Sequence, residues 1–440
     1  MILLFPYTRK TFNKSLSFNF EIKLNKNIFL LWQGQLISQL GTQAFSIVMM
    51  FWLMENTGSS LLISFILTLS ILPSIILGPI SGVTADRVSR KKIIIITDTL
   101  RGFLVLILSM LLFYGSADKS FLVVVFAITA FLNGICRSFF QPAIDAWLPE
   151  LVSSDQLPKT VAFFNSSTQC TSIVGQALGG TLYKILGAPT LLLIDAFSYI
   201  LSAISEYFIK TKQQISRIES IELKEVFKNY KADLIEGLQY VKAKEGMVRT
   251  MLFAASINFF TAPIMLLLPF YVAGQLSSQV QWYGFLLAGM ALGSLAGFWL
   301  SAMITPLGNR RALVMFSSIL CFALCLFLLS QSFSNFNSLI FLTFAGLCLG
   351  LFNLQSMTLF QTCSPSTIRG RVMGLLMTIS SALLPLGLLT GGILGSITNN
   401  DTQFIFSLSS LCIVFLTLLF VFDLKVRNFL FAELPIKSAT

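Results

Sequence analysis

The sequence contains no histidine, and only 11% of its 440 residues are charged. Soluble globular proteins carry about 25% charged residues, so a chain that is this poor in charge and 55% hydrophobic does not fit that class. We therefore expect a lipid bilayer to be its solvent. A membrane-spanning helix needs about 20 mainly apolar residues, so a chain of this length provides for about twelve such helices with short connections.

Motifs for catalysis and for metal binding are also missing from the sequence. It has no Walker-type phosphate loop, no nucleophile elbow and no cluster of metal-ligating residues. This argues against ATP hydrolysis, covalent catalysis, and a resident metal or other cofactor. We predict that the protein is not an enzyme and that ion or solute gradients supply the energy it uses.

Paired cysteines and a cleavable leader are not evident either. The seven cysteines lie in or beside apolar stretches without paired spacing, so we expect no disulfide bonds. Residues 1–26 carry five basic residues but no apolar core followed by a small-residue cleavage site. We therefore predict no cleavable signal peptide and interpret 1–26 as an N-terminal tail.

Long apolar runs, bounded by Gly, Pro, Asn or charged residues, dominate what is present. They fall near 28–53, 60–82, 93–113, 119–140, 161–183, 189–209, 250–273, 281–303, 312–330, 338–360, 372–396 and 402–422. A charged stretch separates the first six from the last six. We predict an all-α membrane protein of twelve transmembrane helices in two six-helix bundles, with this organisation: tail 1–26, bundle 27–209, linker 210–248, bundle 249–422 and tail 423–440.

The net charge of +11 follows membrane topology rather than forming a patch for nucleic acid. A cytoplasmic N-terminus places 27 of the 30 Lys and Arg residues on the cytoplasmic side, the exceptions being Arg101, Lys119 and Lys184. By the positive-inside rule we predict a multi-pass protein of the plasma (inner) membrane with both termini cytoplasmic. Residues 221–240 of the linker are compatible with an amphipathic helix on the inner surface, which anionic lipid would favour.

Glycines spaced by four mark every third predicted helix. Small residues at this spacing let helix backbones approach closely in lipid. A three-helix period repeated four times is typical of 3+3 repeats nested in each bundle. The segments 175–180 and 387–392 both read G-x-x-x-G-G, which indicates that the two bundles share one plan. The marked positions are Gly78, Gly82, Gly175, Gly179, Gly289, Gly293, Gly297, Gly387, Gly391 and Gly395, with a further pair at Gly346 and Gly350.

The segment 82–92, G-V-T-A-D-R-V-S-R-K-K, resembles the G-x-L-A-D-R-x-G-R-[RK] signature of the major facilitator superfamily. Thr84 and Ser89 depart from that pattern, whereas the charged positions match. An acidic residue followed by a basic cluster is able to cap neighbouring helix ends in one conformation and release them in another, although basic residues also set topology. The resemblance implies a major facilitator fold and a gating loop made of Gly82, Asp86, Arg87, Arg90, Lys91 and Lys92.

Further segments resemble the macrolide and siderophore exporter branch of that superfamily. They include F-Q-P-A at 140–143, L-P-E-L-V at 148–152 and R-G-R-V-M-G at 369–374. The run at 175–180 resembles the antiporter motif G-P-x-x-G-G, which is associated with export, with Gln176 in the place of Pro. The positions that match or replace this motif are Gly175, Gln176, Gly179 and Gly180.

Amide side chains supply candidate cavity residues. Because polar groups that face lipid are costly, amides in apolar helices are expected to face a cavity or another helix. A cavity with few charges and many Phe suits an amphipathic or uncharged organic molecule. Two roles are compatible with the pattern, substrate contact or interhelical hydrogen bonding. The candidates are Gln35, Gln39, Gln43, Asn165, Gln169, Asn258, Asn353 and Gln355.

Ionisable residues inside predicted helices form a candidate proton or charge relay. Asp98 and Arg101 stand one turn apart, so they are able to pair with each other or with the gating loop, and we favour a structural or gating role for them. Asp195 has no basic partner evident in the sequence, and we predict it as the proton carrier. A carboxylate stabilised by a helix N-terminus is the alternative for Asp195.

The sequence as a whole predicts a secondary transporter that exports a small organic solute, such as a drug, siderophore or natural product, by proton antiport and alternating access. Its expected partners are the solute, protons and the lipid bilayer, with no nucleic acid, and it is expected to be a monomer. A metabolite uptake permease and a lipid flippase are the alternatives. The direction of solute accumulation separates export from uptake, and movement of labelled lipid would favour the flippase.

Overall fold

The computed structural model describes residues 26–115, 118–210, 235–304, 309–365 and 368–431. Helices account for the described secondary structure, as expected for apolar runs in lipid, where only an internally hydrogen-bonded backbone is stable. The N-terminal half contains α2 (Lys26–Thr57), α3 (Ser60–Arg87), α4 (Arg90–Tyr114), α5 (Lys119–Leu151) and α6 (Leu157–Tyr207). The C-terminal half contains α8 (Glu245–Phe270), a π turn η1 (Tyr271–Gln275), α9 (Gln281–Met303), α10 (Asn309–Ser330), α11 (Asn335–Cys363), α12 (Arg369–Ala382), α13 (Leu384–Ile397), α14 (Thr402–Phe422) and α15 (Leu424–Phe431).

Twelve membrane crossings follow from these helices. Eleven helices in the described part of the chain are long and apolar enough to span a bilayer. One of them, α6, has 51 residues and would be about 76 Å long as a straight helix, more than twice the hydrocarbon thickness. It is broken at Gly187, whose φ of 74° and ψ of 166° suit only glycine, with Pro189 just after the break. It therefore contributes two crossings, and the predicted twelve-helix fold is confirmed.

Several helix ends differ from the prediction. α5 continues through Pro142 to Leu151, well past the predicted end at 140. The predicted helix 372–396 is two helices that meet at Leu383, where Pro385 lies in the first turn of α13 and cannot donate a backbone hydrogen bond to the preceding turn. Helix ends of this kind depend on local turns and packing, which hydrophobicity alone does not report.

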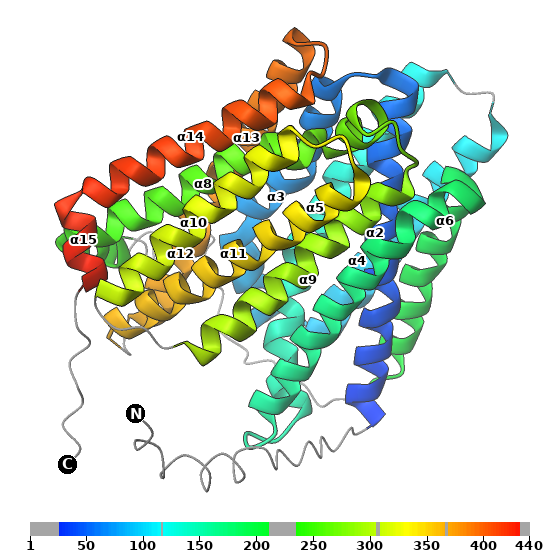
Figure 1. Cartoon of the computed structure of the whole chain (residues 1–440). Helices are drawn as coiled ribbons and strands as arrows, with labels where there is room; N and C mark the ends of the chain where they lie inside the picture. Colours follow the sequence, from blue (N-terminus) through cyan, green and yellow to red (C-terminus); the bar gives the residue numbers. More distant parts are fainter. Residues whose placement is uncertain (1–25, 116–117, 211–234, 305–308, 366–367, 432–440) are drawn as a thin grey trace, which may run out of the picture.

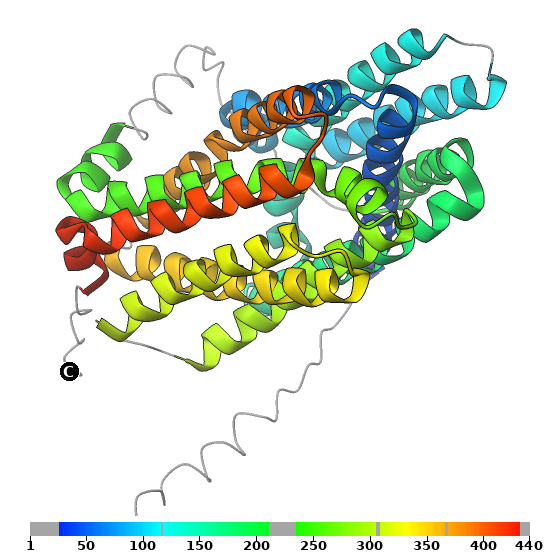
Figure 2. The same ribbon diagram turned by 45° about the horizontal axis from the view of Figure 1, so that its top comes forward.

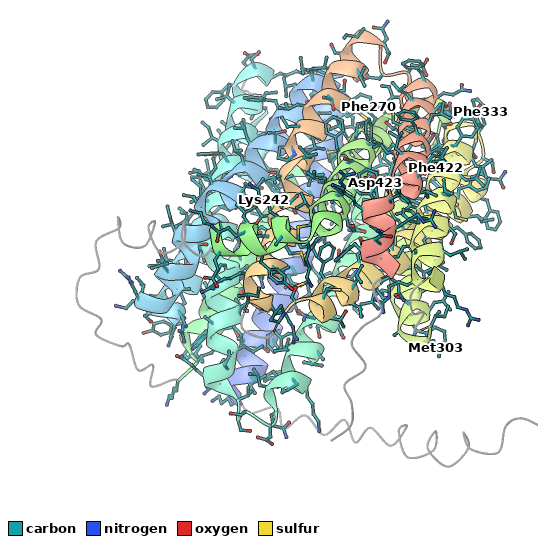
Figure 3. All side chains as sticks on the ribbon, turned by 90° about the vertical axis from the view of Figure 1, so that its left-hand side faces the viewer. Lys242, Phe270, Met303, Phe333, Phe422 and Asp423 are labelled. Atoms are coloured by element: carbon teal, nitrogen blue, oxygen red, sulfur yellow. The ribbon has the colours of Figure 1, made fainter. Side chains whose placement is uncertain are left out.

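A short helix, α15, lies in the segment predicted to be a cytoplasmic tail. Its residues Val426 and Leu430 are buried, and it packs against α8 at the point where α14 ends (Figure 1). Figure 3 shows Asp423 at the junction of α14 and α15, beside α8. The described residues of the second half therefore end in a packed element.

The linker is described only in part. Residues 211–234, which hold most of the predicted amphipathic helix 221–240, lie outside the described residues. Residues 235–243 are helical. Glu236 pairs with Arg371 of α12 at 2.6 Å, and the Tyr240 hydroxyl donates to the carbonyl of Cys363 at the end of α11, also at 2.6 Å. The end of the linker is thus attached to the C-terminal half.

The two ends of the molecule differ. We call one the turn end, where Gly58, Gly115, Gly187 and Asn400 lie in or beside the tight turns between helices. We call the other the basic end, where Arg90, Lys210, Arg249 and Lys425 lie in or beside the helix connections. Figures 1 and 2 show the helices running between these ends, with α9 beside α11 and α8 beside α14.

The halves contact each other through α3 with α13 and through α6 with α9. These contacts are made towards the turn end. Ser60 Oγ of α3 donates to the Gly392 carbonyl at 3.2 Å, and Lys184 Nζ of α6 donates to Gln279 Oε1 at 2.7 Å. Asn400 Nδ2 also donates to the Gly58 carbonyl, at 3.3 Å. The described contacts therefore close the molecule at its turn end.

Glycines make the same contacts in both halves. On α6, Gly175 and Gly179 face α2, and Gly180 faces the start of α9. On α13, the equivalent residues make equivalent contacts: Gly387 and Gly391 face α8, and Gly392 faces α3. The two G-x-x-x-G-G segments thus occupy related places, which agrees with the predicted common plan.

One predicted glycine pair behaves differently. A Cβ built on Gly78 or Gly82 of α3 would meet no atom of the described residues within 4 Å, and the same holds for Gly370 and Gly374 of α12. The expectation that Gly78 and Gly82 mark a close helix contact is therefore wrong for this conformation. At these four glycines the faces of α3 and α12 therefore have no described neighbour within 4 Å of an added Cβ.

Candidate functional site

The predicted gating loop is mostly helical. Gly82, Asp86 and Arg87 lie in the last turns of α3, and Arg90 begins α4, so only Val88 and Ser89 connect the two helices. Ser89 caps α4, because its Oγ accepts from the backbone N–H of Lys92 at 3.4 Å. Ser89 therefore makes the turn by capping the start of α4, whereas the family pattern has glycine at this position. The side chain of Asp86 lies outside the described part of the structure.

Basic residues of this segment bind the ends of neighbouring helices. The Arg90 guanidinium pairs with Glu150 in the last turn of α5, and its Nε donates to the carbonyl of Ala85 at 3.0 Å. Lys91 Nζ donates to the carbonyls of Tyr207 and Ile209, at 2.6 and 2.8 Å, and so caps the C-terminal end of α6. The segment thus connects α3, α4, α5 and α6 at the basic end. Glu150 was not among the predicted site residues.

A small pocket lies between α2 and the first part of α6, near the basic end. Its lining combines aromatic, amide and hydroxyl groups and contains no charged side chain. Trp32 Nε1 donates to Ser167 Oγ at 2.9 Å, which holds the indole ring against α6. The lining residues are Trp32, Gln35, Leu36, Gln39, Phe164, Ser167 and Thr168.

The predicted cavity amides separate into groups. Gln35 and Gln39 both line the pocket. Gln43 lies against Gly175 of α6. Asn165 and Asn353 are exposed, and Gln169 is partly exposed.

Two further amides make interhelical hydrogen bonds. Asn258 Nδ2 of α8 donates to the Ser380 carbonyl of α12 at 2.9 Å. Gln355 Nε2 of α11 is buried and donates to Ser301 Oγ of α9 at 3.0 Å. The structure therefore brings Gln35 and Gln39 together at one pocket and places these two amides between other helices.

Asp98 and Arg101 are both buried on α4, with Arg101 Nη1 3.7 Å from Asp98 Oδ1. The expected pairing of these two residues is therefore present. The guanidinium of Arg101 also stacks over the rings of Phe140 and Tyr199, at 4.9 and 5.6 Å from the ring centres.

Asp195 of α6 is completely buried against α2. Arg101 interacts electrostatically with Asp195 as well as with Asp98. The sequence offered no basic neighbour for Asp195, and Arg101 comes near it because α4 and α6 pack face to face. Arg101 lies 94 residues away in sequence, where no local pattern indicates it.

Glu206 is a site residue that the sequence reasoning missed. Its side chain is completely buried near the end of α6. Its Oε1 accepts from Gln35 Nε2 at 3.2 Å and from Ser202 Oγ at 3.4 Å. A signal was present, because Asp195, Ser198, Ser202 and Glu206 are spaced by three, four and four residues and so share one helix face.

The antiporter-like segment continues the helix without a bend at Gln176. Gln176 Nε2 donates to Ser172 Oγ one turn earlier at 3.2 Å. A Cβ on Gly284 of α9 would overlap the Gln176 carbonyl. Gln176 therefore lies at the contact between the two halves.

Comparison with protein families gives one clear result. A family model described as Major Facilitator Superfamily matches residues 31–388. Macrolide efflux protein A of Streptococcus pyogenes is 26% identical over 366 residues, which cover 82% of this chain and 87% of that protein. Macrolide efflux protein A of Enterococcus faecalis is 26% identical over 336 residues, 75% of this chain and 100% of that protein.

Solved structures with the same fold have much lower identity. The nucleoside transporter NupG, as its D323A mutant, superimposes with a TM-score of 0.69 at 13% identity and covers 91% of this chain and all of that one. A bacterial homologue of the iron transporter ferroportin, in an inward-facing state, also gives a TM-score of 0.69, at 15% identity, with 91% and 99% covered. At such identities the likeness shows the fold alone.

Proposed function

The chain belongs to the major facilitator superfamily, and from this premise we propose that it exports a small organic solute by alternating access in exchange for protons. It is a multi-pass membrane protein that carries a solute. Export is supported by the macrolide efflux proteins among its relatives. The proposal places the protein in the plasma membrane, as a monomer, with the basic end and both termini on the cytoplasmic side.

The observation that carries this proposal is the pocket between α2 and α6. Its lining of Trp32, Phe164, Gln35, Gln39 and two hydroxyl residues contains no charge. Such a lining suits part of an amphipathic or uncharged molecule with hydrogen-bonding groups, and the empty volume of about 170 Å³ is too small to enclose a whole macrolide in this conformation. A sugar or an inorganic ion would need a denser set of polar or charged ligands.

The arrangement of the two halves supports alternating access. The halves meet through α3 with α13 and α6 with α9 at the turn end, whereas the glycines of α3 and α12 at the basic end face open space. If the basic end is cytoplasmic, this is the conformation in which we propose that solute enters from the cytoplasm. Rocking of the halves would then close the basic end and release the solute outside. We keep Asp195 as a proposed participant in proton transfer.

Drug accumulation in intact cells tests this function. We expect cells that produce the protein to accumulate less radiolabelled macrolide than control cells, and an uncoupler that collapses the proton gradient to abolish the difference. Efflux that persists unchanged after uncoupling would refute proton coupling. Higher accumulation in producing cells would refute export in favour of uptake, and transport of labelled lipid alone in proteoliposomes would favour a flippase.

A further inference from the structure

Three carboxylates are enclosed behind the pocket, between α2, α4 and α6. The side chains of Asp98, Asp195 and Glu206 are completely buried. Each has at least one oxygen without a hydrogen-bond partner in the described part of the chain, namely both oxygens of Asp98, Oδ2 of Asp195 and Oε2 of Glu206. Structural carboxylates that are buried normally have all their oxygens hydrogen-bonded or paired, so this cluster needs an explanation.

A comparison of the negative charges of these carboxylates with the positive charges near them gives that explanation. Among the described residues, Arg101 is the guanidinium that interacts electrostatically with all three carboxylates. From α5, the exposed Arg137 lies within electrostatic range of Arg101, and Cys136 also faces the cluster.

The remaining neighbours bring no positive charge. α6 contributes Tyr199, and α2 contributes the uncharged groups of Gln35, Ser38 and Thr42. Three carboxylates therefore exceed the cations even if both arginines are counted. An uncompensated buried charge is costly, so a bound proton is the simplest neutraliser.

Glu206 is the one of the three that is hydrogen-bonded to a residue of the pocket, Gln35. Asp98 and Arg101 pair at 3.7 Å, and Ser198 Oγ lies 3.5 Å from Asp195 Oδ1. Glu206 receives both of its hydrogen bonds on Oε1, from Gln35 and Ser202, and leaves Oε2 without a partner. A proton on this carboxyl group would give Glu206 a hydrogen-bond donor, which its ionised form lacks.

We propose that Glu206 binds the proton and that the orientation of the Gln35 side-chain amide depends on whether this proton is bound. The pocket then presents a different hydrogen-bonding group of Gln35 in each state. Gln35 lines the pocket and also contacts Glu206. An ionised Glu206 accepts from Gln35 Nε2, which leaves Gln35 Oε1 free to accept from a solute. A protonated Glu206 is able to donate to Gln35 Oε1 instead, which turns the amide and presents Nε2 to the pocket.

This exchange gives the sign of the coupling. A solute that donates a hydrogen bond to Gln35 Oε1 prefers the ionised form of Glu206, so solute binding promotes proton release, and proton binding weakens solute binding by the same factor. The step adds one proton to a carboxylate oxygen and later returns it to water, with no other bond broken. The link to export depends on the function proposed above, whereas proton binding by Glu206 does not.

Infrared spectroscopy of the purified protein tests proton binding without any substrate. We expect a carbonyl band of a protonated carboxyl group at neutral pH that loses the contribution of Glu206, and so is clearly weaker, in Glu206→Gln. The matched control is Glu150→Gln, which removes a partly exposed carboxylate paired with Arg90 and should keep the band. An equal band in Glu206→Gln, or no such band in the wild type, would overturn the assignment.

Transport by the same variant tests the coupling. In Glu206→Gln, which resembles a permanently neutral Glu206, we expect proton-driven efflux to fall by about tenfold or more while exchange of solute across the membrane without a gradient continues. Gln35→Leu lacks the amide that connects Glu206 to the pocket. This variant should also lose proton-driven efflux while exchange without a gradient continues. Normal proton-driven efflux in Glu206→Gln would refute the coupling. If the wild type itself exports nothing, the proposed function fails, and the infrared result still decides whether Glu206 binds a proton.

Discussion

The contact between α2 and α6 depends on two glycines. A Cβ on Gly41 would overlap Asp195 Oδ1 and Ser198 Oγ, and a Cβ on Gly34 would lie 3.0 Å from Ser202 Oγ. These glycines are seven residues apart and lie on the same face of α2. They leave the space in which the polar face of α6 is buried against α2.

Gly41→Ala should therefore disturb the carboxylate cluster directly. We expect the added methyl group to displace Asp195 and to lower the free energy of unfolding by about 1–3 kcal/mol, the usual cost of overpacking a buried site. Thermal unfolding in detergent measures this effect. Gly78→Ala is the matched control, because its methyl group would enter open space and should leave the melting temperature unchanged. Equal melting temperatures for both variants would contradict the described contact.

For single residues, the sequence predicted which residues are candidates for the site better than it predicted which residues they contact. Asp98, Arg101 and Asp195 were recognisable because ionisable groups are rare in apolar helices. Glu206 was missed because it stands next to the charged linker, where a glutamate at a helix end is usually solvated. Its burial depends on α2 and α4, and contacts between helices so far apart in the chain are not readable from one sequence.

Among the helices, α15 shows how a short element is held in place. Asp423 caps it, because Oδ1 accepts from the backbone N–H groups of Lys425 and Val426 at 2.9 and 3.4 Å. Asp423 also pairs with Arg249 of α8. A Cβ on Gly246 of α8 would overlap Phe429, so this glycine makes room for the ring. Figure 3 shows Asp423 at this junction.

The attachment of α15 should depend on pH. The slight burial of Asp423 raises its pKa, but the hydrogen bonds from Arg249 and from the two backbone N–H groups outweigh this, so its pKa lies below the ordinary 3.8. A lowered pKa means that the stabilisation is present above the ordinary value and is lost as the pH falls through the lowered one.

Asp423→Asn should therefore loosen α15 at neutral pH, because asparagine removes the charge that Arg249 binds. We expect faster hydrogen exchange of the α15 amides in the variant. Asp118→Asn is the control, since Asp118 precedes α5 without making a side-chain capping bond. Unchanged exchange in α15 would show that the apolar contacts of Val426 and Leu430 are sufficient to hold it.

Helix identity followed from hydrophobicity, whereas helix ends did not. Runs of about 20 apolar residues are required to cross lipid, so their number is readable from the sequence. The break at Leu383 and the extension of α5 to Leu151 depend on where Pro385 and Pro142 fall relative to packed neighbours. A membrane helix can either break near a proline or continue through it, so the sequence did not determine where these helices end.

For the molecule as a whole, the open faces of α3 and α12 predict where the halves meet after rocking. Gly82 on α3 and Gly374 on α12 have free space around them. Their helices continue into the α3 and α13 contact that closes the turn end. Closure at the basic end should therefore bring these two glycine-bearing faces together.

The double variant Gly82→Leu, Gly374→Leu should fold normally and transport poorly. An added Cβ at either position meets no described atom within 4 Å, so we expect an unchanged melting temperature, but the longer side chains should obstruct closure at the basic end and reduce efflux by about tenfold or more. Gly274→Leu is the control, because Gly274 also faces open space but lies near the turn end. Full efflux in the double variant would show that these faces do not meet.

The glycine contacts between the halves have a mechanical consequence. Gly180 faces the carbonyl of Val280, Gly284 faces that of Gln176, and Gly392 faces Ser60 and Ser64. At these points helix backbones and short side chains meet directly, so parting the surfaces there requires no change of a long side-chain rotamer. Packing attraction of this kind falls by about a quarter to a half once a gap of about 0.5–1 Å opens. The viscosity and lateral pressure of the surrounding lipid should then govern how fast the protein alternates.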